Sequence, residues 1–150
     1  MSGVECSNDG VFRHRITVRF GACDPVGIVY FPRYFDWYHQ AMEAWFDEAL
    51  GHPYATLLQE LGLPAVHTEA DYKLPVAFGE KVDVELRLGK LGRTSLRLDY
   101  RVVGLTGTLH ATGSTTCVLI GTRPGTPEHL RPVPVPDWLR TSLERFGVTG

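Results

Sequence analysis

The sequence predicts an α+β domain in which an antiparallel sheet curves around one long, buried helix. Apolar side chains recur at three- and four-residue spacing between residues 31 and 49, which is typical of a helix. Several later segments alternate apolar and polar residues, as half-buried strands do, and short turns separate them. Because the helix is apolar over most of its surface, it needs cover on more than one side. We therefore expect the sheet to wrap around it.

Length and composition narrow the class of protein. A chain of 150 residues is normally one domain with its own core, and residues 1–10, which are small and polar, are expected to form a frayed tail. The formal net charge of −2 gives no general attraction to nucleic acid or to anionic membranes. No apolar run is long enough to span a bilayer, and the start lacks a signal peptide. Three cysteines without CxxC spacing suggest neither a disulfide framework nor a zinc site. We expect a reduced, cytoplasmic protein.

The remaining elements follow from alternation and from turn residues. Residues 13–20 place Ile16, Val18 and Phe20 on one face, which predicts a half-buried strand. Gly51 and Pro53 end the long helix. The other predicted elements are a short helix over 54–61, strands over 66–74, 81–88, 95–103 and 109–120 arranged as a meander, and a terminal helix over 137–146 with Asp137 as a candidate cap.

The start of the long helix carries the most informative chemistry. Pro32 fits the first helical position, because its missing N–H would be unpaired there anyway. Phe31 is then the cap residue, and it has no side-chain oxygen to accept the first-turn amides. Free N–H donors and a partial positive charge are expected there. Asp24 lies one short loop away, so its carboxylate and these donors could hold a polarised carbonyl between them.

A longer motif surrounds these residues. The stretch GACDPVGIVYFPRY, residues 21–34, resembles the signature of the 4-hydroxybenzoyl-CoA thioesterase family of hotdog-fold enzymes. Weaker similarity extends to residues 72–75, 79–80, 92–95 and 131–136. The resemblance runs in order from about Arg15 to Leu143, so convergence on a single motif does not explain it.

The resemblance implies a hotdog fold that dimerises by joining two sheets edge to edge, often pairing again into a dimer of dimers. The active site would lie at the dimer interface, with the helix start from one subunit and sheet residues from its neighbour. Asp24 would attack the thioester carbonyl or activate a water, and the amide of Phe31 would receive the carbonyl oxygen. Such hydrolysis needs no metal or redox cofactor, because coenzyme A is part of the substrate.

The candidate substrate-binding residues fall into three groups, each with a plainer alternative. Glycine and aromatic residues flank the helix start, polar residues are expected to face the acyl group, and cationic or hydroxyl residues are expected to face the phosphates of coenzyme A. The plainer alternatives are an Asx-turn for the aspartate, core packing for the aromatic residues, structural histidines, and a solvated face for the cations. The three groups are Gly27, Tyr30 and Tyr34; His39, His67 and Thr68; and Lys90, Arg93, Thr94 and Ser95.

The acyl group is predicted only by class. In the enzymes specific for 4-hydroxybenzoyl-CoA, an acidic helix residue helps to recognise the phenolic hydroxyl, and His39 stands at that position here. The predicted substrate is therefore a benzoyl-type aromatic or a short-to-medium acyl-CoA.

Two other functions remain as alternatives. A hotdog hydratase would have a catalytic histidine before the helix, and no histidine lies between Phe20 and Tyr38. A non-catalytic acyl-CoA-binding or regulatory module on the same scaffold stays open. The sequence has no GxSxG elbow, phosphate-binding P-loop, dinucleotide fingerprint or HExxH pair, which argues against other common catalytic classes.

Overall fold

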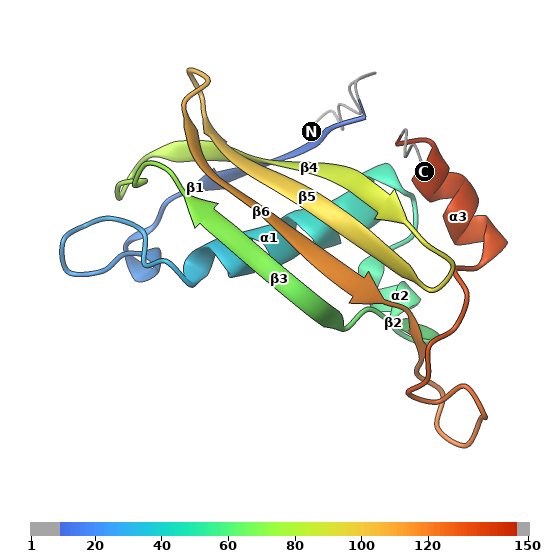
Figure 1. The fold of residues 1–150 in the computed structure, drawn as a ribbon. Coiled ribbons are helices and arrows are strands. Elements are labelled where there is room, and N and C mark those ends of the chain that lie inside the picture. The colour runs from blue at the N-terminus through green and yellow to red at the C-terminus, as the bar shows by residue number, and fades with distance from the viewer. Residues whose placement is uncertain (1–9, 147–150) are drawn as a thin grey trace.

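Five strands form one antiparallel sheet, and the long helix α1 crosses one of its faces (Figure 1). The structure, a computed structural model, describes residues 10–146. In space the strands follow the order β1-β4-β5-β6-β3. Their bounds are Phe12–Thr17 for β1, Ala65–Tyr72 for β3, Lys81–Leu91 for β4, Ser95–Gly104 for β5 and Leu109–Val118 for β6.

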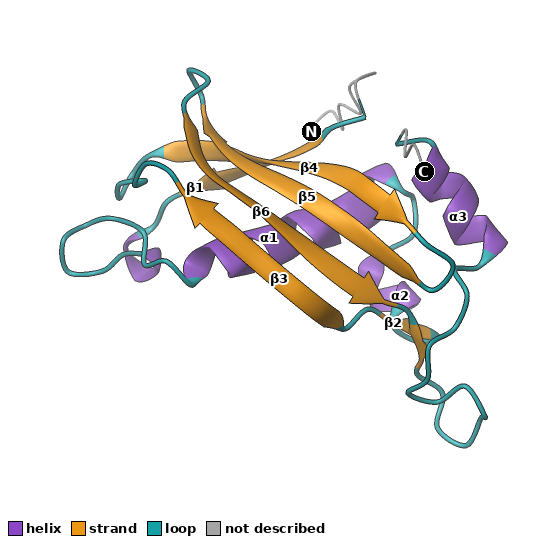
Figure 2. Cartoon of the chain, in the orientation of Figure 1, coloured by secondary structure: helices purple, strands orange, loops and turns teal. Residues whose placement is uncertain are grey.

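The helices and the minor strands complete the chain, and Figure 2 shows their positions relative to the sheet. The long helix is α1, Arg33–Ala44, continued by the π-helical turn η2, Trp45–Ala49. The shorter elements are the 3-10 turn η1 (Phe20–Ala22), the helices α2 (Tyr54–Leu57) and α3 (Asp137–Glu144), and the paired strands β2 (Leu61–Gly62) and β7 (Ile120–Gly121). None of the helices within residues 10–146 is long and apolar enough to cross a membrane.

The core lies between α1 and the sheet. Alternate residues of β4 and β5 are buried there, as the alternating pattern predicts, whereas β3 is largely exposed. The helix and the sheet approach each other closely at Gly113 of β6, where an added Cβ would lie 2.5 Å from the ring of Tyr38 on α1. Glycine therefore allows that ring to lie flat on the sheet, stacked on Tyr100 of β5 with ring centroids 4.4 Å apart. The sheet curves around the helix, as expected.

The predicted meander is right for three strands and wrong for the fourth. Strands β4, β5 and β6 are neighbours in chain order, but β3 does not pair with β4. It pairs with β6 instead, with Thr68 opposite Thr115 and Tyr72 opposite Ala111. Strand β3 thus forms one edge of the sheet, and its other side has no strand partner within the described chain. Alternation identifies a strand, but it does not identify the neighbour with which the strand pairs.

Several predicted boundaries are corrected. Strand β1 ends at Thr17, and Phe20 begins η1 with 71% of its surface exposed, because the amides of Ala22 and Cys23 bond back to the carbonyls of Arg19 and Phe20.

At the helix termini, Pro32 is the cap of α1 and Arg33 its first residue, one position later than predicted. Asp137 is the first residue of α3 and not its cap, which is Pro136. Helix α2 has four residues, because Leu61 enters β2. The predicted tail lies outside the described residues except for Gly10.

Candidate active site

A tight hairpin before α1 carries Asp24. Cys23 and Val29 face each other across it, the Asp24 amide donates to the Ile28 carbonyl at 2.9 Å, and the Gly27 amide donates to the Asp24 carbonyl at 2.9 Å. Gly27 has φ +88°, a conformation that residues with a side chain rarely adopt. This residue is therefore needed for the turn.

The hairpin is also tied to the segment that precedes β4. The amide of Val29 donates to the Val76 carbonyl, and the amide of Phe78 donates to the Gly27 carbonyl, both at 2.9 Å. Figure 1 shows the hairpin projecting beyond the end of the sheet. These bonds hold the projecting loop in one conformation, as a catalytic loop requires.

Only one oxygen of the Asp24 carboxylate is hydrogen-bonded within this hairpin. Its Oδ1 accepts a hydrogen bond from the Val26 amide at 2.9 Å, which is the Asx-turn that a short Asp-Pro sequence favours. Its Oδ2 has no hydrogen-bond donor within residues 10–146, and the side chain is partly exposed. The Asx-turn thus orients the carboxylate and leaves one oxygen available.

The start of α1 offers one free amide where the sequence predicted several. The amides of Arg33, Tyr34 and Phe35 bond to the carbonyls three residues earlier, at 2.9, 3.4 and 3.2 Å. Pro32 has no N–H, so Phe31 alone keeps an amide without an acceptor in the described part of the chain.

The direction of this amide follows from its peptide plane. The Tyr30 carbonyl, which belongs to the same trans peptide, points toward the Arg33 amide inside the helix. The Phe31 N–H therefore points away from the helix, with the partial positive end of the helix dipole behind it. An anionic oxygen would be stabilised at this position.

A cavity of about 350 Å³ lies between α1 and the start of β3. His39 and Thr68, two of the predicted acyl-pocket residues, line it together. The Thr68 hydroxyl lies 3.2 Å from the Thr115 hydroxyl, and Tyr100 also lines the cavity. The other lining residues are Phe35, Met42, Leu63, Pro64, Ala65 and Cys117. The cavity is thus mainly apolar, with hydroxyl groups on its sheet side.

Two titratable side chains, His39 and Cys117, line this cavity. The His39 Nδ1 lies 2.8 Å from the Glu43 carboxylate one helical turn later, and 55% of the histidine side chain is exposed. Burial raises the pKa of the Cys117 thiol to about 11. This cysteine therefore stays a neutral wall at physiological pH and does not supply a thiolate nucleophile.

The other predicted residues are not all gathered at the helix start. Tyr30 is exposed beside Phe31, their rings edge to face at 5.3 Å, whereas Tyr34 is 3% exposed and lies in the core. His67 is exposed on β3 with its Nε2 3.8 Å from Glu69, and it does not line the cavity.

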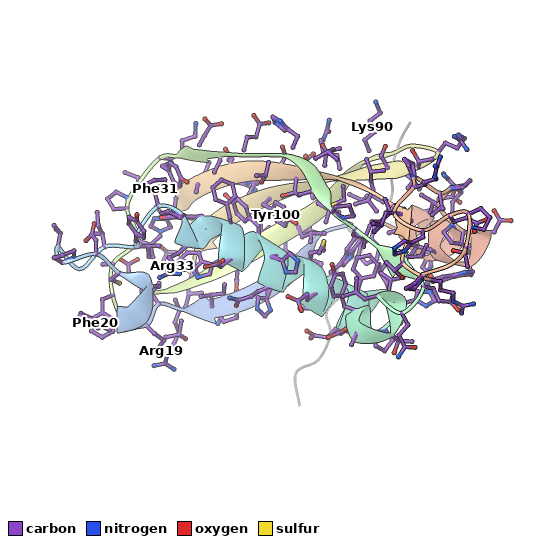
Figure 3. All side chains as sticks on the ribbon, turned by 90° about the horizontal axis from the view of Figure 1, so that it is seen from below. Arg19, Phe20, Phe31, Arg33, Lys90 and Tyr100 are labelled. Atoms are coloured by element: carbon purple, nitrogen blue, oxygen red, sulfur yellow. The ribbon has the colours of Figure 1, made fainter. Side chains whose placement is uncertain are left out.

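The predicted nucleotide-binding residues lie toward the opposite end of the folded molecule from the start of α1. Lys90 belongs to the end of β4, and Arg93, Thr94 and Ser95 follow at the turn into β5. Figure 3 shows Lys90 and Phe31 at opposite ends of the molecule. One chain therefore does not bring the predicted catalytic and nucleotide-binding residues together.

Comparison with known proteins identifies the family. The profile of the thioesterase-like superfamily matches residues 18–143. A 1,4-dihydroxy-2-naphthoyl-CoA hydrolase from Synechococcus elongatus is 32% identical over 142 residues, covering 89% of this chain and 98% of the relative. The chain belongs to the thioesterase-like superfamily.

Solved structures of thioesterases share the fold. The dynemicin thioesterase is 27% identical, with a TM-score of 0.83 over 93% of this chain and 99% of its own. A gentisyl-coenzyme A thioesterase is 25% identical, with a TM-score of 0.77 over 87% and 98%. The predicted hotdog fold and the predicted enzyme class, thioester hydrolase, are confirmed. The narrower assignment to the 4-hydroxybenzoyl-CoA thioesterases stays a prediction.

Sequence reasoning missed part of the cavity of this thioesterase. Phe35 and Met42 belong to the apolar helix stripe and were not among the predicted site residues. Thr115 and Cys117 lie on β6, whose pairing with β3 the sequence did not reveal, and Tyr100 lies on β5, the next strand of the sheet. Knowing that β3 pairs with β6 would have been the signal to find them. Within residues 10–146, no group of three His, Cys, Asp or Glu side chains gathers where it could hold a metal ion.

Proposed function

We propose that this thioesterase hydrolyses a hydroxylated aromatic acyl-CoA to the free acid and coenzyme A, with Asp24 and the Phe31 amide at the reaction centre. The observation that carries the proposal is the unpaired Phe31 amide, which points out of the start of α1 and follows a hairpin with a free Asp24 oxygen. A positioned donor and a positioned carboxylate together can catalyse thioester hydrolysis.

The proposed chemistry uses only these groups and water. The thioester carbonyl oxygen accepts a hydrogen bond from the Phe31 amide, which stabilises the negative charge that develops during attack. Asp24 either attacks the carbonyl carbon to form an acyl anhydride, which water then hydrolyses, or takes a proton from an attacking water. In both routes the carbon–sulfur bond breaks, and coenzyme A leaves as a thiolate that takes up a proton. No metal or redox cofactor takes part.

The cavity beside α1 is the proposed site for the acyl group. Its volume of about 350 Å³ lies at the lower end of the range for ligand pockets, which suits one or two aromatic rings. Its hydroxyls and His39 offer partners to a hydroxylated ring. A relative named 1,4-dihydroxy-2-naphthoyl-CoA hydrolase and a structural neighbour named gentisyl-coenzyme A thioesterase support this substrate class.

A homodimer completes the proposed site through β3. The open edge of this strand exposes backbone hydrogen-bonding groups and apolar side chains such as Val66, which is 62% exposed. Two-fold pairing of this edge is antiparallel, so the Tyr72 end of one β3 comes to lie beside the Ala65 end of the other. Because Tyr72 contacts Phe31 and Ala65 lines the cavity, the helix start of one subunit approaches the cavity of its neighbour.

The same pairing accounts for the distant cations. Ser95 lies opposite Val118 and Ala65 lies opposite Cys117, so the β4–β5 turn and the start of β3 share one end of the sheet. In the dimer, that end meets the neighbour's helix start. Lys90, Arg93, Thr94 and Ser95 would then bind the phosphates of a coenzyme A whose thioester lies at the other subunit's Phe31. A second pairing of dimers into a tetramer is part of the proposal.

The proposal is tested with a panel of acyl-CoA thioesters and a reagent that detects free thiol. The panel contains 1,4-dihydroxy-2-naphthoyl-, 4-hydroxybenzoyl-, benzoyl-, phenylacetyl- and medium-chain aliphatic CoA. The highest kcat/KM is expected for a hydroxylated aromatic substrate. Preference for an aliphatic substrate would contradict the proposed acyl class, and binding without thiol release would favour a non-catalytic acyl-CoA-binding module.

A further inference from the structure

Tyr72 bridges the edge strand and the helix start. It is the last residue of β3, and its hydroxyl donates to the Phe31 carbonyl at 3.1 Å. Its ring meets Phe31 edge to face at 6.2 Å and Tyr34 at 5.1 Å. Burial raises the pKa of the Tyr72 hydroxyl, so it remains protonated and can donate at physiological pH. This hydrogen bond from β3 to the cap region of α1 therefore ends on the residue with the free amide.

The Tyr72 bond acts on a residue that otherwise has little to hold it. The peptide before Phe31 is fixed, because the Tyr30 carbonyl accepts from the Arg33 amide at 2.9 Å. The carbonyl on the other side of Phe31 has only a long contact, 3.4 Å, from the Tyr34 amide. The Phe31 side chain is 57% exposed and gives little packing restraint. The Tyr72 hydroxyl supplies the shorter bond on that side.

We propose that Tyr72 is a positioning residue, which holds the Phe31 amide in the orientation that binds the thioester oxygen. This inference rests on the proposed function. Tyr72 donates to the carbonyl of Phe31 and not to the substrate, so it acts through the backbone. With both flanking peptide planes tied, the N–H keeps its direction while charge develops on the oxygen, and no reorganisation is needed.

If Tyr72 had only a packing role, Tyr72→Phe would keep the wild-type kcat. If Tyr72 only fills the space between β3 and α1, its ring contacts with Phe31 and Tyr34 are what matter. Tyr72→Phe keeps both rings in contact and removes only the hydroxyl. The variant therefore separates the hydrogen bond from the packing.

The experiment compares wild type, Tyr72→Phe and Ser142→Ala on the best substrate of the acyl-CoA panel. Ser142 is buried in α3, and its hydroxyl lies 3.3 Å from the Trp138 carbonyl and 3.1 Å from His52, so its removal also deletes hydrogen bonds. We expect Tyr72→Phe to lower kcat about tenfold with KM changed less than about twofold, because the amide donor is present but no longer held. Ser142→Ala should keep the wild-type kcat.

Other outcomes would overturn the inference. A wild-type kcat in Tyr72→Phe would remove the positioning role, and so would an equal loss in Ser142→Ala, which would show a general loss of stability. Dissociation of the Tyr72→Phe oligomer, measured by light scattering, would assign the effect to assembly. Failure of the proposed function is a separate result: the wild-type enzyme would then hydrolyse no thioester of the panel.

Discussion

At the scale of single residues, the central feature is the Asp24 carboxylate, of which only one oxygen is hydrogen-bonded within residues 10–146. The Asx-turn to the Val26 amide was the plainer alternative for Asp24, and the structure contains it. It does not exclude catalysis, because the second oxygen is left without a donor within residues 10–146. The turn instead restricts the rotation of the side chain, which favours a defined direction of attack.

Asp24→Asn separates the structural role of this side chain from the chemical one. The asparagine oxygen still accepts from the Val26 amide, so the fold and the thermal midpoint should stay close to those of wild type. An amide is neither a nucleophile nor a base, so kcat should fall by at least about a hundredfold. Steady-state assays and a thermal melt measure both effects. Near-normal turnover would remove Asp24 from the mechanism.

Among the cavity residues, His39 is the proposed residue for recognising a hydroxyl group on the acyl ring. It lines the cavity, and its Nδ1 is held by Glu43, which leaves Nε2 for a ligand. His39→Phe should lower kcat/KM for a hydroxylated aromatic thioester about tenfold more than for benzoyl-CoA, because one hydrogen bond to the hydroxyl is lost.

Gln40→Ala, an exposed neighbour on the same helix, is the control for this comparison and should change neither substrate. Equal effects of His39→Phe on the two thioesters would show that the histidine is only a packed helix residue.

The sequence singles out Asp24 and Phe31 because a loop followed by an uncapped helix start is a local pattern, and their catalytic roles stay predictions. The surroundings of these residues were harder to predict. The bonds that leave only one free amide could not be foreseen, since they depend on a tightened first turn. Tyr72 was part of a recognised motif, but its bond to Phe31 joins residues 41 positions apart.

At the scale of secondary-structure elements, the contact between α1 and β6 depends on one glycine. A Cβ at Gly113 would lie 2.5 Å from the Tyr38 ring and 2.7 Å from the Glu69 carbonyl oxygen, and the second atom belongs to the backbone. Neither neighbour can move freely, because Tyr38 is stacked on Tyr100 and Glu69 is held in β3 opposite Ser114.

Gly113→Ala should therefore reduce the free energy of unfolding by about 1–3 kcal/mol through overpacking. The matched control is Gly21→Ala, where an added Cβ meets nothing within 4 Å and the backbone is not left-handed. Its effect should stay within about 0.5 kcal/mol. Urea unfolding of the two variants measures the difference. Equal stability would mean that α1 shifts away from β6 at little cost.

Strands could be predicted where the alternation of apolar and polar residues was long. The strands with which they pair could not be predicted. The alternation of β4 and β5 gave both strands within a few residues of their bounds, because a strand with one buried face must alternate. The partner of β3 and the end of β1 at Thr17 depend on where the chain turns in space. Phe20 continues the alternating pattern, yet it leaves the sheet because the chain must turn into the hairpin.

At the scale of the whole molecule, the predicted site residues fall into two separate groups. The Phe31 amide and the Asp24 hairpin lie at one end of the sheet, and the Lys90–Ser95 turn lies at the other end. Only a second subunit joined through the open edge of β3 unites them in the proposed function. A sequence pattern cannot give this arrangement by itself, because it depends on which edge of the sheet is free.

Complementation between two impaired subunits tests this account most directly. Asp24→Asn and Arg93→Ala chains are mixed after reversible dissociation and assayed at low concentration of the best acyl-CoA. In a mixed dimer, one of the two sites combines an intact Asp24 with an intact Arg93 from the other chain. The mixture should therefore recover roughly a quarter of the wild-type kcat/KM, although each variant alone is impaired. If Asp24 and Arg93 served the same site within one chain, the mixture would show only the average of the two variants, and the account of a site shared between subunits would be contradicted.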